Sequence, residues 1–265
     1  MERRHSPYQL RNTQADRIGQ LARKVPEITA YFWIIKLLTT AMGEATSDFF
    51  VLNYNPYLAV TIGGIALALA LALQFAVKGY IAWIYWLAVS MVAVFGTMAA
   101  DGLHVQLGVP YIASTAFFAI VLAIVFFAWH KTEKTLSIHS IVTPTREFFY
   151  WATVLATFAL GTAAGDLTAT TIGLGYFSSA ILFAILICIP ALAYKSHLFG
   201  EIGTFWAAYI LTRPLGASIA DWLSKPHSIG GKNYGDGHVA IVLALIIAGF
   251  VSYLSVSRVD VDNRT

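Results

Sequence analysis

Residues 33–48 read WIIKLLTTAMGEATSD, and their spacing of Trp, Gly and Asp returns three more times along the chain. The other copies are 86–101 (WLAVSMVAVFGTMAAD), 151–166 (WATVLATFALGTAAGD) and 206–221 (WAAYILTRPLGASIAD). In each copy Gly follows Trp by ten residues and Asp follows by fifteen. Recurrence at a fixed spacing indicates a copied supersecondary unit. Every copy has kept a carboxylate in an apolar segment, where a charge is costly and points to a function.

The composition is typical of a membrane protein. Hydrophobic residues make up 58% of the chain and charged residues 12%, against about 25% charged residues in soluble domains. A bilayer core of about 30 Å is spanned by about 20 helical residues. Apolar runs close to that length lie at about 28–47, 57–77, 80–100, 109–129, 147–165, 174–194, 203–220 and 238–256. We therefore expect an all-α integral membrane protein with eight transmembrane helices.

The repeats set the expected arrangement of these helices. Each repeat holds two spans, so all copies enter the membrane in the same direction. We expect four parallel two-helix repeats about a pseudo-symmetry axis along the membrane normal. The expected parts are a basic cytoplasmic arm (1–24), an eight-helix membrane domain (25–257) with repeats at about 25–78, 79–130, 144–195 and 199–257, and a cytoplasmic tail (258–265). The arm lacks the pattern of a cleaved signal peptide, and it lies either on anionic lipid or in water.

The distribution of Lys and Arg predicts the orientation. In the expected topology, thirteen of the seventeen basic residues lie on one side, in the arm, the tail and the connections between repeats. Lys225 and Lys232 lie on the other side, and Lys36 and Arg213 lie within spans. This asymmetry places both termini in the cytoplasm, with the chain in a bacterial inner membrane. It also accounts for the net charge of +3, so the charge is no sign of nucleic-acid binding.

One face of each odd-numbered span carries polar residues. Positions three, seven, eleven and fifteen after the Trp are spaced by four and share a helix face. The charged residues and threonines of this polar stripe are Lys36, Thr40, Glu44, Asp48, Thr97, Asp101, Thr162, Asp166, Arg213 and Asp221. A charge facing lipid at mid-membrane costs about 2.5–3.5 kcal/mol on insertion scales. We therefore expect Lys36 and Arg213 to face the interior, paired and close to Glu44, and the whole set to line an ion pathway.

A second stripe, of small residues, lies beside the polar one. It contains Gly43, Gly96, Gly161 and Gly216, each followed four residues later by Ser, Ala or Gly. Small residues at this spacing let helices approach closely in lipid, and we favour packing over substrate contact for these glycines. If the odd-numbered spans pack through this face, their polar stripes converge near a central axis. The more apolar even-numbered spans then form an outer layer that faces lipid.

Three histidines near the expected outer surface, His104, His227 and His238, are close in sequence to Asp residues. A His/Asp cluster at this mouth could bind a divalent metal, and ordinary surface histidines are the alternative interpretation. The Gly-rich connection Ser224–Gly237 is expected to form a flexible turn or lid. The sequence contains no HExxH, CxxC, P-loop or nucleophile-elbow motif, so we assign no catalytic residue and no cofactor.

A family resemblance is carried by the motifs GEATSD, GTMAADG, GTAAGD and RPLGASIAD, together with Trp33, Trp86, Trp151 and Trp206. From Lys24 to Leu254 the chain resembles a bacterial membrane family known mainly as a fourfold repeat of unknown function. Each repeat of that family holds two transmembrane helices and a characteristic Trp. The resemblance implies the architecture, and it supplies no substrate and no functional residue.

Three functions of different classes are compatible with the sequence. Interior acids (Glu44 and the four repeat Asp residues) outnumber the two interior bases, which favours a secondary transporter for a hard cation, in concrete form a proton-coupled divalent ion. The alternative is an anion or small organic-acid carrier that uses Lys36 and Arg213. A non-transporting scaffold or membrane enzyme comes last, because no catalytic dyad is recognisable. Expected partners are the lipid bilayer and a small ion or molecule, and no nucleic acid is expected. The sequence is also compatible with a homo-oligomer.

Overall fold

The structure is a computed structural model that describes residues 23–196 and 199–261. This part of the chain is helical and contains no β-strand. Its eight long helices are α2 (Ala30–Asn53), α3 (Pro56–Ala76), α4 (Ala82–Asp101), α5 (Tyr111–Glu133), α6 (Pro144–Asp166), α7 (Gly175–Lys195), α8 (Glu201–Ser224) and α9 (Asp236–Ser257). The prediction of an all-helical chain is confirmed. Most of the predicted arm (1–22) and the end of the predicted tail (262–265) lie outside the described residues.

Local sequence signals explain several of the helix boundaries. The side chains of Thr29, Asn55 and Thr143 each accept a hydrogen bond from the backbone amide three residues further on. Such caps satisfy amides that have no partner inside the helix. Pro56 and Pro144 then occupy the first helical position of α3 and α6, where the missing proline N–H is tolerated.

Six of the eight helices are long and apolar enough to cross a membrane, which identifies a membrane protein. They are α3, α4, α5, α6, α7 and α9, where α4 and α6 are extended by the short π-helical turns η1 (Gly102–Gln106) and η3 (Leu167–Thr171). The other two, α2 and α8, have 24 residues each. Each of these two helices contains three charged residues, so their composition alone does not mark them as spans.

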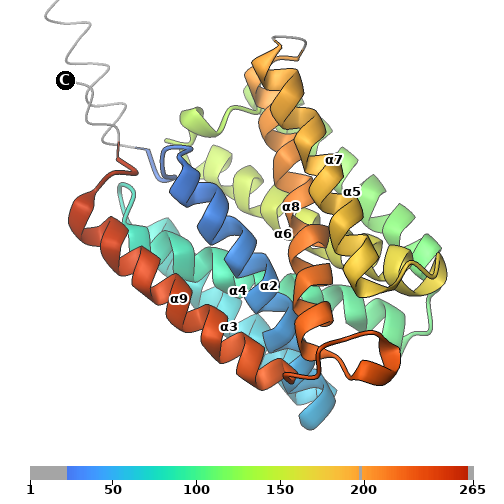
Figure 1. Cartoon of the computed structure of the whole chain (residues 1–265). Coiled ribbons are helices and arrows are strands. Elements are labelled where there is room, and N and C mark those ends of the chain that lie inside the picture. The colour runs from blue at the N-terminus through green and yellow to red at the C-terminus, as the bar shows by residue number, and fades with distance from the viewer. Residues whose placement is uncertain (1–22, 197–198, 262–265) are drawn as a thin grey trace, which may run out of the picture.

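The helices form two layers. The inner layer is a closed ring, in which α2 packs against α4 and α8, and α6 packs against α4 and α8 (Figure 1). The outer helices lie against this ring in cyclic order: α3 on α4, α5 on α6, α7 on α8, and α9 on α2. Each outer helix therefore packs chiefly on the inner helix of the next repeat, and the last repeat packs on the first.

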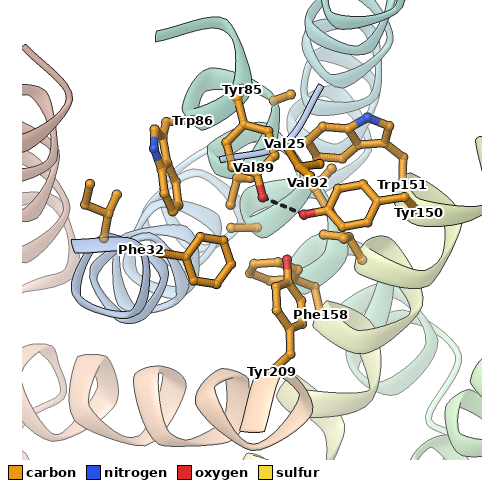
Figure 2. Close-up of a cluster of buried hydrophobic side chains, with 14 of the residues drawn as sticks. Val25, Phe32, Tyr85, Trp86, Val89, Val92, Tyr150, Trp151, Phe158 and Tyr209 are labelled. Atoms are coloured by element: carbon orange, nitrogen blue, oxygen red, sulfur yellow. Dashed lines mark hydrogen bonds between the residues drawn. The ribbon is translucent and has the colours of Figure 1, made fainter. Parts of the chain in front are cut away.

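The four inner helices run in the same direction, because corresponding ends meet. Aromatic side chains from the N-terminal parts of these helices form a shared layer (Figure 2). Contacts in this layer join neighbouring helices: Phe32 with Trp86, Tyr85 with Trp151, Tyr150 with Trp206, and Phe205 with Phe32, at ring-centroid distances of 5.7–6.2 Å. The hydroxyls of Tyr85 and Tyr150 also share a hydrogen bond of 2.5 Å. This aromatic layer fills the ring at one end.

Close approach between inner helices occurs at the four repeat glycines. A Cβ atom added at any of them would lie under 3.0 Å from a side chain of the next inner helix. The neighbours are Ala93 for Gly43, Phe158 for Gly96, Arg213 for Gly161, and Thr40 for Gly216. The same position in every repeat therefore brings one inner helix against the next, which is the role of small residues in helix packing within lipid.

The outer helices present an apolar surface. Leu69, Phe127, Ile185 and Leu245, from α3, α5, α7 and α9 respectively, are each more than 60% exposed. In the most apolar 18-residue stretch of α3, α5, α7 and α9, no more than 28% of the residues are buried, whereas at least 67% are buried in the same stretch of α4 and α6. Large exposed apolar surfaces of this kind mark contact with a membrane or with another protein.

Candidate functional site

The predicted polar stripe faces the interior of the inner ring. Lys36, Thr40 and Glu44 of α2 are buried, as are Thr97 of α4 and Thr162 of α6. From α8, Arg213 is fully buried and Asp221 is 4% exposed. The other three repeat Asp residues, Asp48, Asp101 and Asp166, are half-buried at the opposite end of the ring from the aromatic layer.

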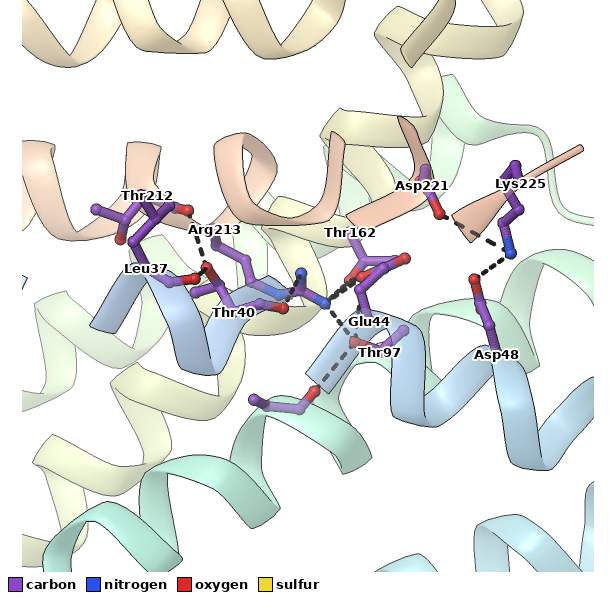
Figure 3. Close-up of polar contacts among 11 residues, drawn as sticks. Leu37, Thr40, Glu44, Asp48, Thr97, Thr162, Thr212, Arg213, Asp221 and Lys225 are labelled. Atoms are coloured by element: carbon purple, nitrogen blue, oxygen red, sulfur yellow. Dashed lines mark hydrogen bonds and ion pairs between the residues drawn. The ribbon is translucent and has the colours of Figure 1, made fainter. Parts of the chain in front are cut away.

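Arg213 lies at the centre of the site and binds all three of the other inner helices (Figure 3). Its Nη2 donates to Glu44 Oε2 at 2.6 Å and to Thr162 Oγ1 at 2.6 Å, and it also donates to Thr97 Oγ1. Its Nη1 donates to the Thr40 carbonyl oxygen at 3.3 Å. A guanidinium presents several donors in a fixed plane, so one side chain satisfies acceptors from three directions. We call Arg213, Glu44, Thr97 and Thr162 the central network.

Lys36 departs from the expected pairing. Its side chain is 1% exposed, and its Nζ has no hydrogen-bond partner among the described residues. The ammonium lies 4.1 Å from the ring centroid of Phe158 and 4.2 Å from that of Tyr209. Aromatic faces attract cations through the ring quadrupole. Aromatic rings thus take the place of the carboxylate that the sequence led us to expect, because Glu44 is engaged by Arg213 instead.

Three carboxylates converge on the side of Arg213 that faces away from the aromatic layer. Glu44, Asp166 and Asp221 each offer an oxygen, and these atoms all lie within 4.8 Å of one another. They come from the first, third and fourth repeats. Within the described residues, this is the one group of three or more potential metal-ligating side chains. We call these three residues the carboxylate triad.

The triad contains an unsatisfied acceptor. Oδ1 of Asp221 is buried and has no hydrogen-bond partner among the described residues, although the ammonium of Lys225 lies 3.9 Å away. A buried carboxylate oxygen without a partner is costly. Such a group in a native protein calls for a specific explanation, and one explanation is an ion that binds there.

Asp48 is engaged differently from its counterparts in the triad. It accepts a hydrogen bond from Lys225, which directly follows α8. Lys225 also contacts Asp236, the first residue of α9, at 3.3 Å. Burial lowers the pKa of Lys225, but the charges of Asp48, Asp221 and Asp236 outweigh it, and the net effect raises the pKa. The ammonium of Lys225 therefore stays protonated.

Asp101 and Asp166 mark a difference between the repeats. Directly after them the chain passes into the π-helical turns η1 and η3, whereas α2 and α8 remain α-helical beyond Asp48 and Asp221. Single π-helical turns occur frequently at functional sites. Asp101 is not a member of the triad.

The structure does not bring the three candidate histidines together with the triad. His104 in η1 stacks on Tyr111, with ring centroids 3.2 Å apart. His227, in the 3-10 turn η4 (His227–Ile229), pairs its Nδ1 with the Gly231 carbonyl oxygen at 2.8 Å. His238 lies in the first turn of α9. The metal-ligating group found among the described residues contains carboxylates only.

The predicted lid is a folded connection. After Lys225 the chain turns back on the end of α8, where Lys232 N donates to the Trp222 carbonyl at 2.7 Å and Tyr234 N to the Leu223 carbonyl at 3.1 Å. Asn233 N donates to the Lys225 carbonyl at 2.8 Å. In the sequence, Lys225 is recognisable only as a basic residue of an outer connection. Its spacing of four from Asp221 is the signal that could have identified it.

A second buried ion pair lies near the aromatic end of the ring. Lys24 Nζ donates to Glu147 Oε2 at 2.5 Å, and Gln74 Nε2 donates to Glu147 Oε1 at 3.0 Å. This network ties the segment before α2 to the end of α3 and the start of α6. Lys24, which we assigned to the basic arm, is thus packed into the helical domain. No sequence pattern singled out Glu147.

A groove of about 870 Å³ lies between α2, α7 and α8, outside the ring. Trp33, Ile187, Ala191 and Leu215 are among the residues that line it. Trp33 is half-buried there, whereas the other three repeat Trp residues are buried. None of the ten residues of the predicted pathway lines this groove, so it is separate from the central network.

The fold and the repeated sequence define the class: a helical membrane protein built from four tandem repeats. Comparison with protein families identifies the repeat. A family model described as a Repeat of Unknown Function (DUF347) matches residues 31–80, 84–135, 149–196 and 204–260, and the chain belongs to this family. No curated protein and no solved structure is significantly similar to the chain. The prediction of four tandem repeats is confirmed.

Proposed function

We propose that all eight long helices cross the membrane as four parallel repeats about an axis along the membrane normal. The cyclic packing of the inner and outer helices supports this arrangement. It explains why α2 and α8 can hold charges, since Lys36, Glu44 and Arg213 are buried inside the ring, away from lipid. From the distribution of Lys and Arg, we expect both termini in the cytoplasm of a bacterium and the carboxylate triad on the outer side of the inner membrane.

Within this arrangement the protein is a secondary transporter for a hard divalent cation, not an enzyme. The observation that carries the proposal is the convergence of Glu44, Asp166 and Asp221, whose oxygens lie within 4.8 Å of one another. Hard cations bind oxygen at about 2.0–2.6 Å, so two oxygens on one ion are at most about 4–5 Å apart. The triad already has nearly this spacing, and Asp221 supplies an oxygen that has no hydrogen-bond partner in the described part of the chain.

The charge balance of the site also favours a cation. Glu44 is paired with Arg213, and Asp48 is paired with Lys225. Asp101, Asp166 and Asp221 add three further carboxylates, and of these only Asp221 has a basic group within 4.0 Å among the described residues. Negative charges that remain unbalanced in a protein interior attract either a metal ion or protons. Exchange of bound protons for a divalent ion is the form of coupling that this balance suggests.

The path toward the cytoplasm is closed in this conformation. From the triad toward the cytoplasmic end of the ring, the interior is filled first by the central network. Lys36 follows, between Phe158 and Tyr209, and the aromatic layer comes last. A cation that leaves the triad toward the cytoplasm must replace Arg213 as the partner of Glu44. Breaking the contact between Arg213 and Glu44 is therefore the expected step of alternating access.

The test is ion flux in proteoliposomes loaded with a divalent-sensitive dye. Wild type is expected to transport the cation, and Glu44→Gln and Asp48→Asn are expected to abolish flux while the protein still assembles by size-exclusion chromatography. Glu201→Gln is the matched control, because Glu201 is an exposed carboxylate at the opposite end of α8. Near-normal flux in both site variants would contradict the proposal.

One observation favours a second candidate, a carrier of a small anion or organic acid. The Lys36 Nζ is buried and has no hydrogen-bond acceptor among the described residues, and an anion would supply one. Arg213, the other base of this candidate, is already engaged by Glu44. The measurement is uptake of a panel of anions and of divalent cations into proteoliposomes. Anion uptake that Lys36→Met abolishes, together with no uptake of divalent cations, would show that the protein is an anion carrier.

A further inference from the structure

Lys225 occupies the outer end of the ring beside the carboxylate triad. Its ammonium contacts Asp48 of the first repeat and lies 3.9 Å from Asp221 (Figure 3). It also lies 3.3 Å from Asp236. The Lys225 side chain is only 15% exposed. One basic side chain therefore lies among carboxylates from α2, α8 and α9, at the point where an ion from outside would meet them.

The connection after α8 holds Lys225 in this place. The Lys225 carbonyl oxygen accepts a hydrogen bond from Asn233 N at 2.8 Å, and the Lys225 amide donates one to the Asp221 carbonyl oxygen at 2.9 Å. Gly231 lies so close to the Lys225 carbonyl that an added Cβ would collide with it. The backbone at Lys225 is thus tied on both sides, so the ammonium can leave the carboxylates only by movement of the side chain or of the whole connection.

We propose that Lys225 is a tethered cation that competes with the incoming ion for Asp48 and Asp221, and that this competition selects divalent over monovalent cations. The inference rests on the proposed cation transport and names the device that controls its site. A monovalent ion replaces the ammonium charge for charge, so the exchange brings no Coulombic gain. A divalent ion doubles the attraction to the same carboxylates and can drive the ammonium out into water.

Lys232 provides a matched control within the same connection. Its Nζ lies 5.3 Å from the ring centroid of Trp222, and it forms no ion pair with a carboxylate among the described residues. Lys232→Met therefore removes the same charge from the same segment without opening the cluster. Lys225→Arg keeps the charge at the original position and is expected to keep the competition.

The test measures binding of Mn²⁺ to the purified full-length protein by electron paramagnetic resonance, with K⁺ as the monovalent competitor. Lys225→Met and Lys225→Gln are both expected to bind Mn²⁺ about tenfold more tightly than wild type, which corresponds to about 1.4 kcal/mol. In both variants, unlike wild type, K⁺ is expected to compete with Mn²⁺. Lys232→Met and Lys225→Arg are expected to behave as wild type does. Two variants at position 225 guard against a failure of one to assemble.

The possible failures are distinguishable. If both Lys225 variants bind Mn²⁺ no better than wild type, while Asp221→Asn removes binding, Lys225 is no competitor but the cation site stands. If Lys232→Met tightens binding as much as Lys225→Met does, the effect is general electrostatics and the inference is overturned. Absence of Mn²⁺ binding from wild type and from every Lys225 variant would overturn the proposed function and this inference together.

Discussion

Arg213 of the fourth repeat donates to Glu44 of the first at 2.6 Å, and both side chains are buried within the ring. This contact joins the first and last copies of the repeat across the interface of α2 and α8. Thr97 and Thr162, from the two middle repeats, accept hydrogen bonds from the same guanidinium. Each of the four repeats thus contributes one side chain to a single network at the centre of the protein.

Removal of Arg213 is expected to leave Glu44 charged and unpaired in the interior. Arg213→Met should lower the free energy of unfolding by about 3–5 kcal/mol, because breaking one side of a buried ion pair is more costly than replacing both. The double variant Arg213→Met with Glu44→Gln should recover part of the loss. Unfolding in detergent, followed by circular dichroism, measures the effect. An Arg213→Met protein as stable as wild type would show that the pair has no structural role.

The hydroxyls that bind Arg213 can be tested one at a time. Thr162→Val keeps the shape of the side chain but removes an acceptor for a charged donor, and it should cost about 1.5–3 kcal/mol. Thr153 on the same helix is the matched control, because its hydroxyl is buried without a hydrogen-bond partner among the described residues. Thr153→Val should leave stability unchanged or slightly increased. Equal losses in the two variants would argue against the central network.

The close approach of α8 to α2 predicts opposite effects at two glycines of one helix. Gly216→Ala places a methyl group against Thr40 and should cost about 1–3 kcal/mol through overpacking. Gly203, also in α8, has no described atom within 4 Å of an added Cβ, so Gly203→Ala should be neutral or stabilising by up to about 1 kcal/mol. The measurement is the melting temperature of both variants in the same detergent. A Gly216→Ala protein whose melting temperature equals or exceeds that of Gly203→Ala would contradict the close packing of α8 on α2.

The pKa of Lys225 gives a prediction for pH. The raised pKa of the folded state means that the ion pairs of Lys225 stabilise the fold fully below the unfolded lysine value of about 10.4, and lose this effect as pH rises toward the folded value. The difference in melting temperature between wild type and Lys225→Met should therefore stay constant between about pH 7 and 9. A difference that shrinks steadily over this range would mean that Lys225 is not held by the carboxylates.

Sequence spacing was sufficient to predict the helical fold and the four repeats. The interval from Trp33 to Asp48 recurs without a gap in each copy. Because an α-helix has a constant pitch, equivalent positions of the copies lie on the same face of each helix. The polar stripe could therefore be placed on one face before the ring was known. The same reasoning grouped Glu44 with Arg213, because closure of a fourfold repeat brings its first and last copies together.

Contacts that depend on side-chain reach or on connections could not be predicted in this way. Lys36 shares its helix face with Glu44, but its ammonium lies between Phe158 and Tyr209. This contact depends on which side chains of the neighbouring helices pack at the same level inside the ring. Lys225 reaches the carboxylates because the following connection folds back on α8, which no helical period encodes. Glu147 pairs with Lys24 across 123 positions of sequence, and no repeated pattern predicts this pair.

The most direct test of the carboxylate triad is the binding of a divalent cation to purified protein in detergent, measured by titration calorimetry with Mn²⁺. Asp166→Asn is the most informative variant, because Asp166 belongs to the triad and, among the described residues, forms no ion pair whose loss would disturb the ring. Glu201→Gln serves as the control. The account predicts that wild type and Glu201→Gln bind Mn²⁺ alike and that Asp166→Asn weakens binding by about tenfold or more, a loss of at least about 1.4 kcal/mol. Equal binding by all three proteins, or none by wild type, would contradict it.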